Sequence, residues 1–132
     1  MTRIKICGLK TIEDIQDVNR WKPDFAGFVF APGKRQITLE QAAELRRALD
    51  SKIQAVGVFV NAPLEEATAL ADAGVIQLIQ LHGEEDAVYM ENLRRRTDKP
   101  LIKAVAARSR EEILEAENLP CEYLLLDAYR KG

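Results

Sequence analysis

The sequence predicts an α/β protein with parallel strands, and three patterns support this class. Short apolar runs alternate along the chain with segments of helical periodicity. Most of these runs are almost continuously apolar, which is typical of parallel strands covered by helices. The connections between them are short, which favours right-handed β-α-β crossovers. An open doubly wound sheet and a closed (βα)8 barrel both satisfy this alternation.

Six runs are predicted to form strands, and each is rich in β-branched or other apolar residues. In chain order they are Arg3–Cys7, Phe25–Phe30, Ile53–Val60, Ile76–Leu81, Leu101–Val105 and Tyr123–Asp127. The intervals between them carry apolar stripes at helical spacing, as in Ile12, Ile15 and Val18. The sequence therefore predicts a (βα)5β arrangement of six strands and five helices.

The predicted helices carry start and stop signals of their own. Two residue pairs have the spacing of a capping box, Thr38 with Gln41 and Ser109 with Glu112. Pro63 suits a first helical turn, residues 84–86 place acid at a helix start, and Gly74 suits a helix end. These signals indicate that each helix is bounded by its own local sequence.

The turn after the first strand distinguishes the two architectures. A dinucleotide-binding open sheet would carry G-x-G-x-x-G at this point, but the chain reads Cys7-Gly8-Leu9-Lys10. The open sheet thereby loses its main support, and the (βα)8 barrel is favoured.

Composition indicates a single soluble domain with little attraction for polyanions. The 132 residues are 47% apolar and 30% charged, with a formal net charge of -2. This balance favours neither nucleic acid nor an anionic membrane as a partner. No apolar run approaches the ~20 residues of a membrane helix, and Met1 leads directly into a strand pattern. We therefore expect a cytoplasmic protein.

Polar residues at the carboxyl ends of the strands are the candidates for chemistry, because those ends meet at one rim. Cys7 ends the first strand and is either a proton acceptor or a small buried residue. Asp127 ends the sixth and is either a general acid in apolar surroundings or a helix N-cap. Arg35 is either a carboxylate ligand or a solvated loop residue.

Four further residues are less specific. His82, the only histidine, and Gln80 lie around the end of the fourth strand, and Lys103 lies within the fifth. By themselves they are as compatible with structural positions as with a ligand pocket. Cys121 precedes the sixth strand at the opposite rim and is interpreted as core filler; without C-x-x-C or a histidine cluster, neither a disulfide nor a metal site is indicated.

Five motifs together resemble the phosphoribosylanthranilate isomerase family. In order they are Lys5-Ile6-Cys7-Gly8-Leu9, Gly27–Pro32 followed by Arg35, Val56–Asn61, Gln80–Glu84 and Leu125–Asp127. The resemblance implies a TIM barrel of tryptophan biosynthesis that performs an Amadori rearrangement of N-(5-phosphoribosyl)anthranilate without cofactor or metal. It also implies Cys7 as general base, Asp127 as general acid, Arg35 as ligand of the anthranilate carboxylate, and Gln80 and His82 as pocket-lining residues.

The chain is shorter than that family pattern. Residues 1–132 are interpreted as one partial barrel domain lacking strands 7 and 8, so weak or no activity is expected, together with self-association through open sheet edges. Two other functions remain open. One is a non-catalytic partial barrel that pairs its edges with another chain, and the other is a different sugar-phosphate barrel isomerase.

Overall fold

The computed structural model describes residues 3–106 and 108–127, with the side chain of Asp127 outside the described part. Within these residues six parallel strands form one sheet in the order β1-β2-β3-β4-β5-β6. The strands are β1 (Lys5–Cys7), β2 (Phe25–Val29), β3 (Gln54–Phe59), β4 (Leu78–Leu81), β5 (Leu101–Ala106) and β6 (Tyr123–Asp127). The predicted α/β class and strand number are therefore confirmed.

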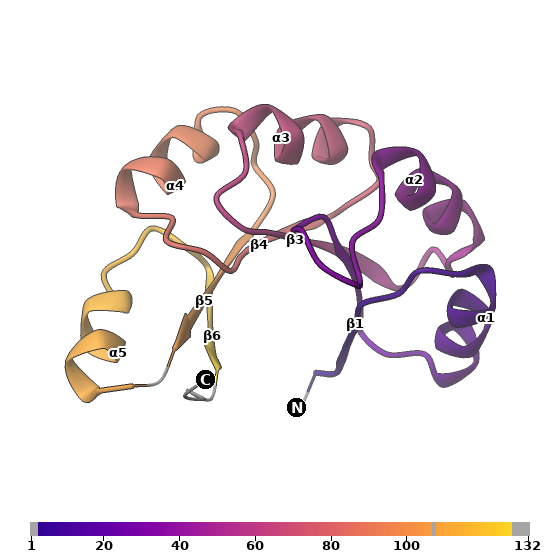
Figure 1. The fold of residues 1–132 in the computed structure, drawn as a ribbon, viewed down its shortest axis with the longest axis horizontal. Coiled ribbons are helices and arrows are strands. Elements are labelled where there is room, and N and C mark those ends of the chain that lie inside the picture. The colour runs from indigo at the N-terminus through magenta and orange to yellow at the C-terminus, as the bar shows by residue number, and fades with distance from the viewer. Residues whose placement is uncertain (1–2, 107, 128–132) are drawn as a thin grey trace.

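Five helices connect the strands and cover one face of the sheet. They are α1 (Ile12–Trp21), α2 (Leu39–Ala48), α3 (Leu64–Asp72), α4 (Ala87–Arg94) and α5 (Arg110–Ala116). Figure 1 shows the sheet curving as an arc, with the helices along its convex side and β1 and β6 at its two ends. This arrangement is the predicted (βα)5β part of a barrel.

The main core lies between the sheet and the helices. Phe28, Phe59 and Ile79 from the strands belong to the same buried cluster as Ile15 and Leu93 from the helices. All five are at most 1% exposed. Burying a side chain of this size stabilises the fold by about 1.5–3 kcal/mol, so this cluster fixes the strands that carry the site.

The other face of the sheet forms the concave interior. Paired residues in neighbouring parallel strands share a face, and faces alternate along each strand. Cys7 pairs with Gly27, Gly27 with Val56, and Val56 with Leu78. Val56 and Leu78 are buried but lie outside the helix-facing cluster. The row that begins at Cys7 therefore faces the interior.

Local capping explains most helix boundaries. Thr38 and Gln41 form the predicted capping box at α2, and Thr11 with Asp14 forms another at α1. Gly74 follows α3 with a φ of 76°, a left-handed conformation that suits glycine. None of the helices in the described ranges is long and apolar enough to cross a membrane.

Two helix starts differ in detail from the predictions, and a third agrees. Pro63 is the N-cap of α3 rather than a residue of its first turn. Ser109 caps α5, but the Glu112 carboxylate pairs with Arg108. Asp86 caps α4 and its carboxylate accepts from the backbone N–H of Tyr89, so the acid predicted at this helix start is confirmed. Glu85 of the same segment has another role, described below.

Candidate active site

The Cys7 thiol lies at the carboxyl end of β1 against a glycine of the neighbouring strand. A methyl group built on Gly27 would lie 2.8 Å from Cys7 Sγ and 3.1 Å from its Cβ. Real carbon atoms essentially never approach so closely, so only glycine leaves room for the thiol here. Cys7 is partly exposed and is not in a disulfide. Its sulfur is thus held in the interior at the rim that the sequence predicted.

Arg35 is brought to the same place by the loop after β2. Gly8 has a φ of 87°, and a methyl group on it would lie 2.6 Å from Arg35 Cδ. The Arg35 side chain therefore passes directly over the residue that follows Cys7. Lys10 fixes the loop, because its Nζ donates to the carbonyl oxygen of Lys34 at 2.7 Å. The predicted thiol and guanidinium thus share one corner of the rim.

Gln80 faces the interior from β4 and contacts a residue that the sequence reasoning did not single out. It is 3% exposed, and its Oε1 accepts a hydrogen bond from Lys5 Nζ. Burial lowers the pKa of the Lys5 ammonium, and the charge of the nearby Cys7 thiolate opposes this shift. Lys5 was missed because an apolar strand pattern gives no signal for an inward-facing lysine.

The prediction for the Asp127 carboxyl falls on a side chain outside the described residues. The backbone of residue 127 ends β6 and pairs with Ala106 at the end of β5. The register places position 127 at the same rim as Cys7, since all six strands are parallel.

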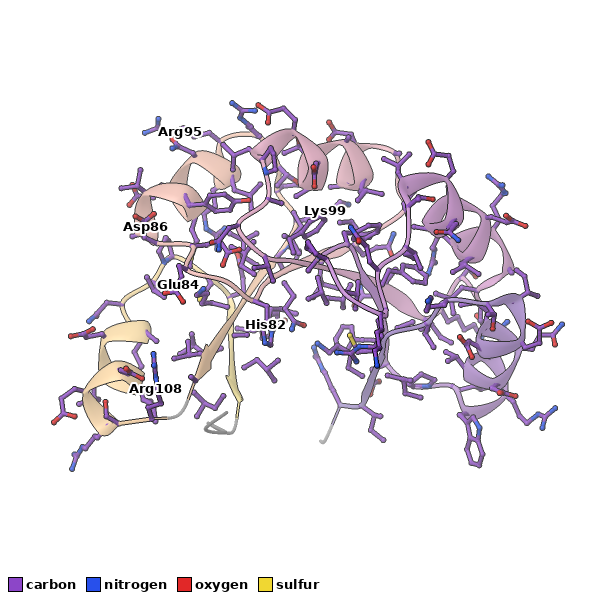
Figure 2. The ribbon with its side chains drawn as sticks, viewed as in Figure 1. His82, Glu84, Asp86, Arg95, Lys99 and Arg108 are labelled. Carbon is purple, nitrogen blue, oxygen red and sulfur yellow. The ribbon has the colours of Figure 1, made fainter. Side chains whose placement is uncertain are left out.

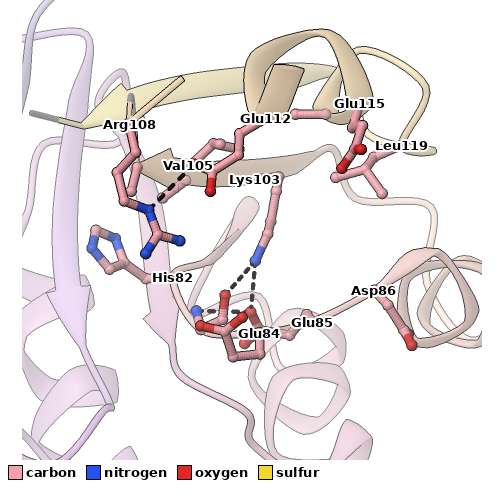
Figure 3. A pocket seen from close by; sticks show the side chains of 14 residues that line it. His82, Glu84, Glu85, Asp86, Lys103, Val105, Arg108, Glu112, Glu115 and Leu119 are labelled. Atoms are coloured by element: carbon pink, nitrogen blue, oxygen red, sulfur yellow. Dashed lines mark hydrogen bonds and ion pairs between the residues drawn. The ribbon is translucent and has the colours of Figure 1, made fainter. Parts of the chain in front are cut away.

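His82 lies apart from Gln80, beside a cavity of about 470 Å³. The cavity is bounded by the loop 82–86, the second half of β5, and α5. Figure 3 shows the His82 ring on the same side as the Arg108 guanidinium, and Figure 2 places both residues in the whole chain. Among the described residues, neither Cys7, Arg35 nor Gln80 lines this cavity. The predicted pocket-lining pair is thus divided between two places.

A buried ion pair at the edge of this cavity connects three segments. Lys103 Nζ lies 3.1 Å from Glu85 Oε1 and donates to the Gly83 carbonyl oxygen at 2.6 Å. The two Glu85 oxygens also accept from the backbone N–H groups of Gly83 and Asn61, at 2.8 and 2.7 Å. Lys103 therefore points toward the helices, which settles an alternative that the sequence left open. The network holds the loops after β3 and β4 against β5.

Cys121 occupies the structural position predicted for it. It lies before β6, packs against the helix-facing core, and is a free thiol. Burial raises its pKa, although the backbone of Lys103 and nearby cations partly oppose the shift. Both thiols are partly exposed, but a thiol with a raised pKa is the less reactive one, so Cys7 is the thiol better suited to chemistry.

Comparison with known protein families gives one match along almost the whole chain. Residues 4–132 match the model of the family described as N-(5'-phosphoribosyl)anthranilate (PRA) isomerase. The chain belongs to the PRA isomerase family. The resemblance seen in the five sequence motifs is thereby confirmed.

Curated PRA isomerases are similar over the full span of the chain. The protein from Lachnoclostridium phytofermentans is 51% identical over 127 residues, which are 96% of this chain and 58% of that protein. The Clostridium kluyveri protein is 45% identical over 132 residues, covering 100% and 65%. The chain thus spans about three fifths of the length of these relatives.

Solved PRA isomerases share the fold. The Thermotoga maritima structure aligns with a TM-score of 0.88 at 34% identity, covering 100% of this chain and 64% of that one. A PRA isomerase in complex with reduced 1-(o-carboxyphenylamino)-1-deoxyribulose 5-phosphate aligns with a TM-score of 0.86 at 34% identity, covering 98% and 66%. The partial-barrel architecture is therefore that of the family.

Proposed function

We propose that this protein functions as a phosphoribosylanthranilate isomerase. The observation that carries the proposal is the family match across residues 4–132. The reaction would convert N-(5-phosphoribosyl)anthranilate, an aminoaldose, into the aminoketose 1-(o-carboxyphenylamino)-1-deoxyribulose 5-phosphate. The relative solved with a reduced form of this aminoketose supports the same substrate class here.

In this proposal the chemistry consists of proton transfers between two protein groups and one sugar. Asp127 protonates the ribose ring oxygen as the C1′–O bond breaks, which leaves a Schiff base. The Cys7 thiolate then removes the C2′ proton to give an enolamine, which tautomerises to the ketone. The steps open the ring, move protons and shift double bonds without any net gain or loss of electrons, so the scheme requires neither a redox cofactor nor a metal.

The placement of the backbone supports these roles. Cys7 and residue 127 end β1 and β6, and both strands run in the same direction. Following the paired residues from strand to strand assigns Cys7 to the interior face of the sheet, and the backbone of residue 127 ends at the same rim. Two groups of opposite protonation could therefore act on one bound sugar.

Arg35 is proposed to hold the anthranilate carboxylate. Its guanidinium lies beside Gly8, next to Cys7, and two parallel hydrogen bonds from it would match a planar carboxylate. Gln80 and His82 are proposed to line the substrate pocket, Gln80 within the interior and His82 at the rim. Because these two residues lie in different places, each would touch a different part of the substrate.

The test uses the purified 132-residue chain, N-(5-phosphoribosyl)anthranilate, and an analogue with aniline in place of anthranilate. We expect conversion of the anthranilate compound at a low rate and much weaker use of the aniline compound. Equal conversion of both compounds would favour a different sugar-phosphate isomerase, because Arg35 would then not bind a carboxylate of the substrate. A chain that shows no turnover and does not bind the reduced aminoketose would contradict the proposal.

A second candidate is a partial barrel that pairs its edges with another chain. Ile4 beside β1 and Leu126 in β6 are 58% and 51% exposed, at the two ends of the sheet. Apolar edges of this kind favour self-association. Light scattering during size-exclusion chromatography would distinguish the two, since a monomer with isomerase turnover would remove this candidate.

The wider setting follows from the proposed reaction. The proposed function places the protein in tryptophan biosynthesis, with a phosphorylated small molecule as its partner, and we propose the cytoplasm as the site of action. The interpretation of the chain as a single partial barrel domain lacking strands 7 and 8 stays a prediction.

A further inference from the structure

Lys5 and Cys7 are neighbours on the interior face of β1. They are alternate residues of one strand, so their side chains project to the same side with Cα atoms about 7 Å apart. Cys7 Sγ lies over Gly27 on β2. Lys5 is therefore one step deeper in the same interior, on the side away from the rim.

The Lys5 ammonium is held there from the far side of the interior. Its Nζ donates to Gln80 Oε1 on β4, although β2 and β3 separate β1 from β4 in the sheet. The bond therefore crosses the concave interior instead of running between adjacent strands. An amide oxygen accepts the hydrogen bond without neutralising the ammonium, so Gln80 fixes the position of the charge and leaves it available to Cys7.

Few other charges face this thiol from the described residues. The interior positions of β2, β3 and β5 near it are uncharged: Gly27, Val29, Val56, Val58, Ile102, Ala104 and Ala106. Arg35 approaches from the loop after β2, and His82 follows β4. Asp127, whose side chain is outside the description, ends β6. Lys5 is thus the cation held within the interior itself.

We propose that Lys5 is a positioning residue that keeps Cys7 in its thiolate form, with Gln80 holding the ammonium in place. This inference rests on the proposed function, in which Cys7 must accept a proton from carbon. A free thiol with a pKa of ~8.5 is only a few per cent ionised at neutral pH. The Lys5 ammonium is held by Gln80 within the same interior that Cys7 faces, and a positive charge in such a place favours the ionised form of a thiol.

The supporting energetics are those of a partly buried cation. Burial is the main cause that lowers the pKa of Lys5, and the charge of Cys7 opposes this shift, so the two side chains interact electrostatically. The effect of removing the Lys5 charge should therefore be measured as the pH dependence of Cys7 reactivity, which a purely structural role of Lys5 would leave unchanged.

The experiment measures the rate at which iodoacetamide, a neutral reagent, alkylates Cys7 as a function of pH. The sequence has two cysteines, so the Cys121→Ser background leaves Cys7 as the single thiol. In this background Lys5→Met keeps the side-chain stem and removes the charge, whereas Lys5→Arg keeps the charge. Lys52→Met makes the same change in net charge in the exposed turn before β3, at the opposite end of the sheet.

We expect Lys5→Met to lower the alkylation rate at pH 7 by about tenfold and to move the midpoint of the profile up by about one pH unit. The rate at high pH, where every thiol is ionised, should be retained, because the substitution changes the ionisation of Cys7 and not its accessibility, and an unchanged circular dichroism spectrum shows that the fold persists. Gln80→Leu should move the midpoint in the same direction by less. Lys5→Arg and Lys52→Met should leave it unchanged.

A Lys5→Met profile that coincides with the parent profile would overturn the inference. This measurement needs no isomerase turnover, so it separates the two proposals. If the chain is inactive but the midpoint moves with Lys5→Met, the role of Lys5 stands and the proposed function is contradicted. If the chain is active but the midpoint does not move, the proposed function stands and the role of Lys5 is contradicted.

Discussion

Breaking the Glu85–Lys103 pair is expected to destabilise the fold much more than removing both charges together. The side chains are 0% and 8% exposed, so neither charge can be solvated once its partner is lost. Leaving one buried charge unpaired costs about 3–5 kcal/mol. Lys103→Met should lie near the lower limit, because the Glu85 carboxylate keeps its bonds from Gly83 N and Asn61 N.

The double variant Glu85→Gln/Lys103→Met contains no buried charge at this position. Its remaining cost is a backbone N–H left without an acceptor, about 1–3 kcal/mol. The sum of the two single effects should therefore exceed the double effect by at least about 3 kcal/mol, which is a clear coupling energy. Total stability of a domain is only about 5–15 kcal/mol, so each single variant should unfold at markedly lower urea concentration.

Urea denaturation followed by circular dichroism measures this cycle at neutral pH. The Arg96–Glu65 pair is a suitable control, because its atoms lie 3.2 Å apart with side chains 47% and 73% exposed. Removing that pair should leave the denaturation midpoint almost unchanged. Additive single effects in the Glu85–Lys103 cycle, or losses no larger than those of the control, would refute the reasoning.

Three further predictions address the site and its surroundings. Gly27→Ala should cost about 1–3 kcal/mol of stability and, by moving the Cys7 sulfur, lower turnover about 10²-fold. Gly57→Ala also creates a 2.8 Å contact, but on the helix-facing side, so it should lose stability and retain kcat/KM per folded molecule. Arg35→Ala should raise KM about 10–100-fold with little change in kcat, whereas a fall in kcat alone would argue against carboxylate binding. Burial, followed by nearby carboxylates, raises the pKa of Tyr89 to about 12. The folded state therefore favours the neutral phenol, and its contribution to stability is complete below pH ~10 and lost as the pH rises through about 12. Titration of absorbance near 295 nm should show a late step that Tyr89→Phe removes; titration of that step near pH 10 would contradict the assignment.

Local patterns predicted the fold well because parallel strands and helix caps are encoded over short distances. The run Tyr123–Asp127 is β6 without change, and the predicted strand Ile53–Val60 is β3 less one residue at each end. Thr38 and Gln41 cap α2 with the spacing read from the sequence. These features depend on residues within one turn or one strand, where sequence reasoning is most reliable.

The parts of the site that the sequence did not reveal depend on contacts between distant segments. Nothing within residues 84–86 distinguishes the buried Glu85 from the exposed Glu84, because the difference is made by Lys103 on β5 and by Asn61 after β3. The bond from Lys5 to Gln80 likewise depends on the curvature of the sheet, which brings non-adjacent strands within reach. Rim positions could be predicted from strand ends, whereas partners across the interior could not.

The most direct test of the proposed isomerase is the turnover of Cys7→Ala on N-(5-phosphoribosyl)anthranilate, compared with that of Cys121→Ala. The proposal predicts a fall of about 10²–10⁴-fold for Cys7→Ala, as expected for loss of a general base. Cys121→Ala, which alters only a core-packing thiol at the other rim, should keep kcat/KM within about twofold. Equal turnover in the two variants would show that Cys7 is not the base.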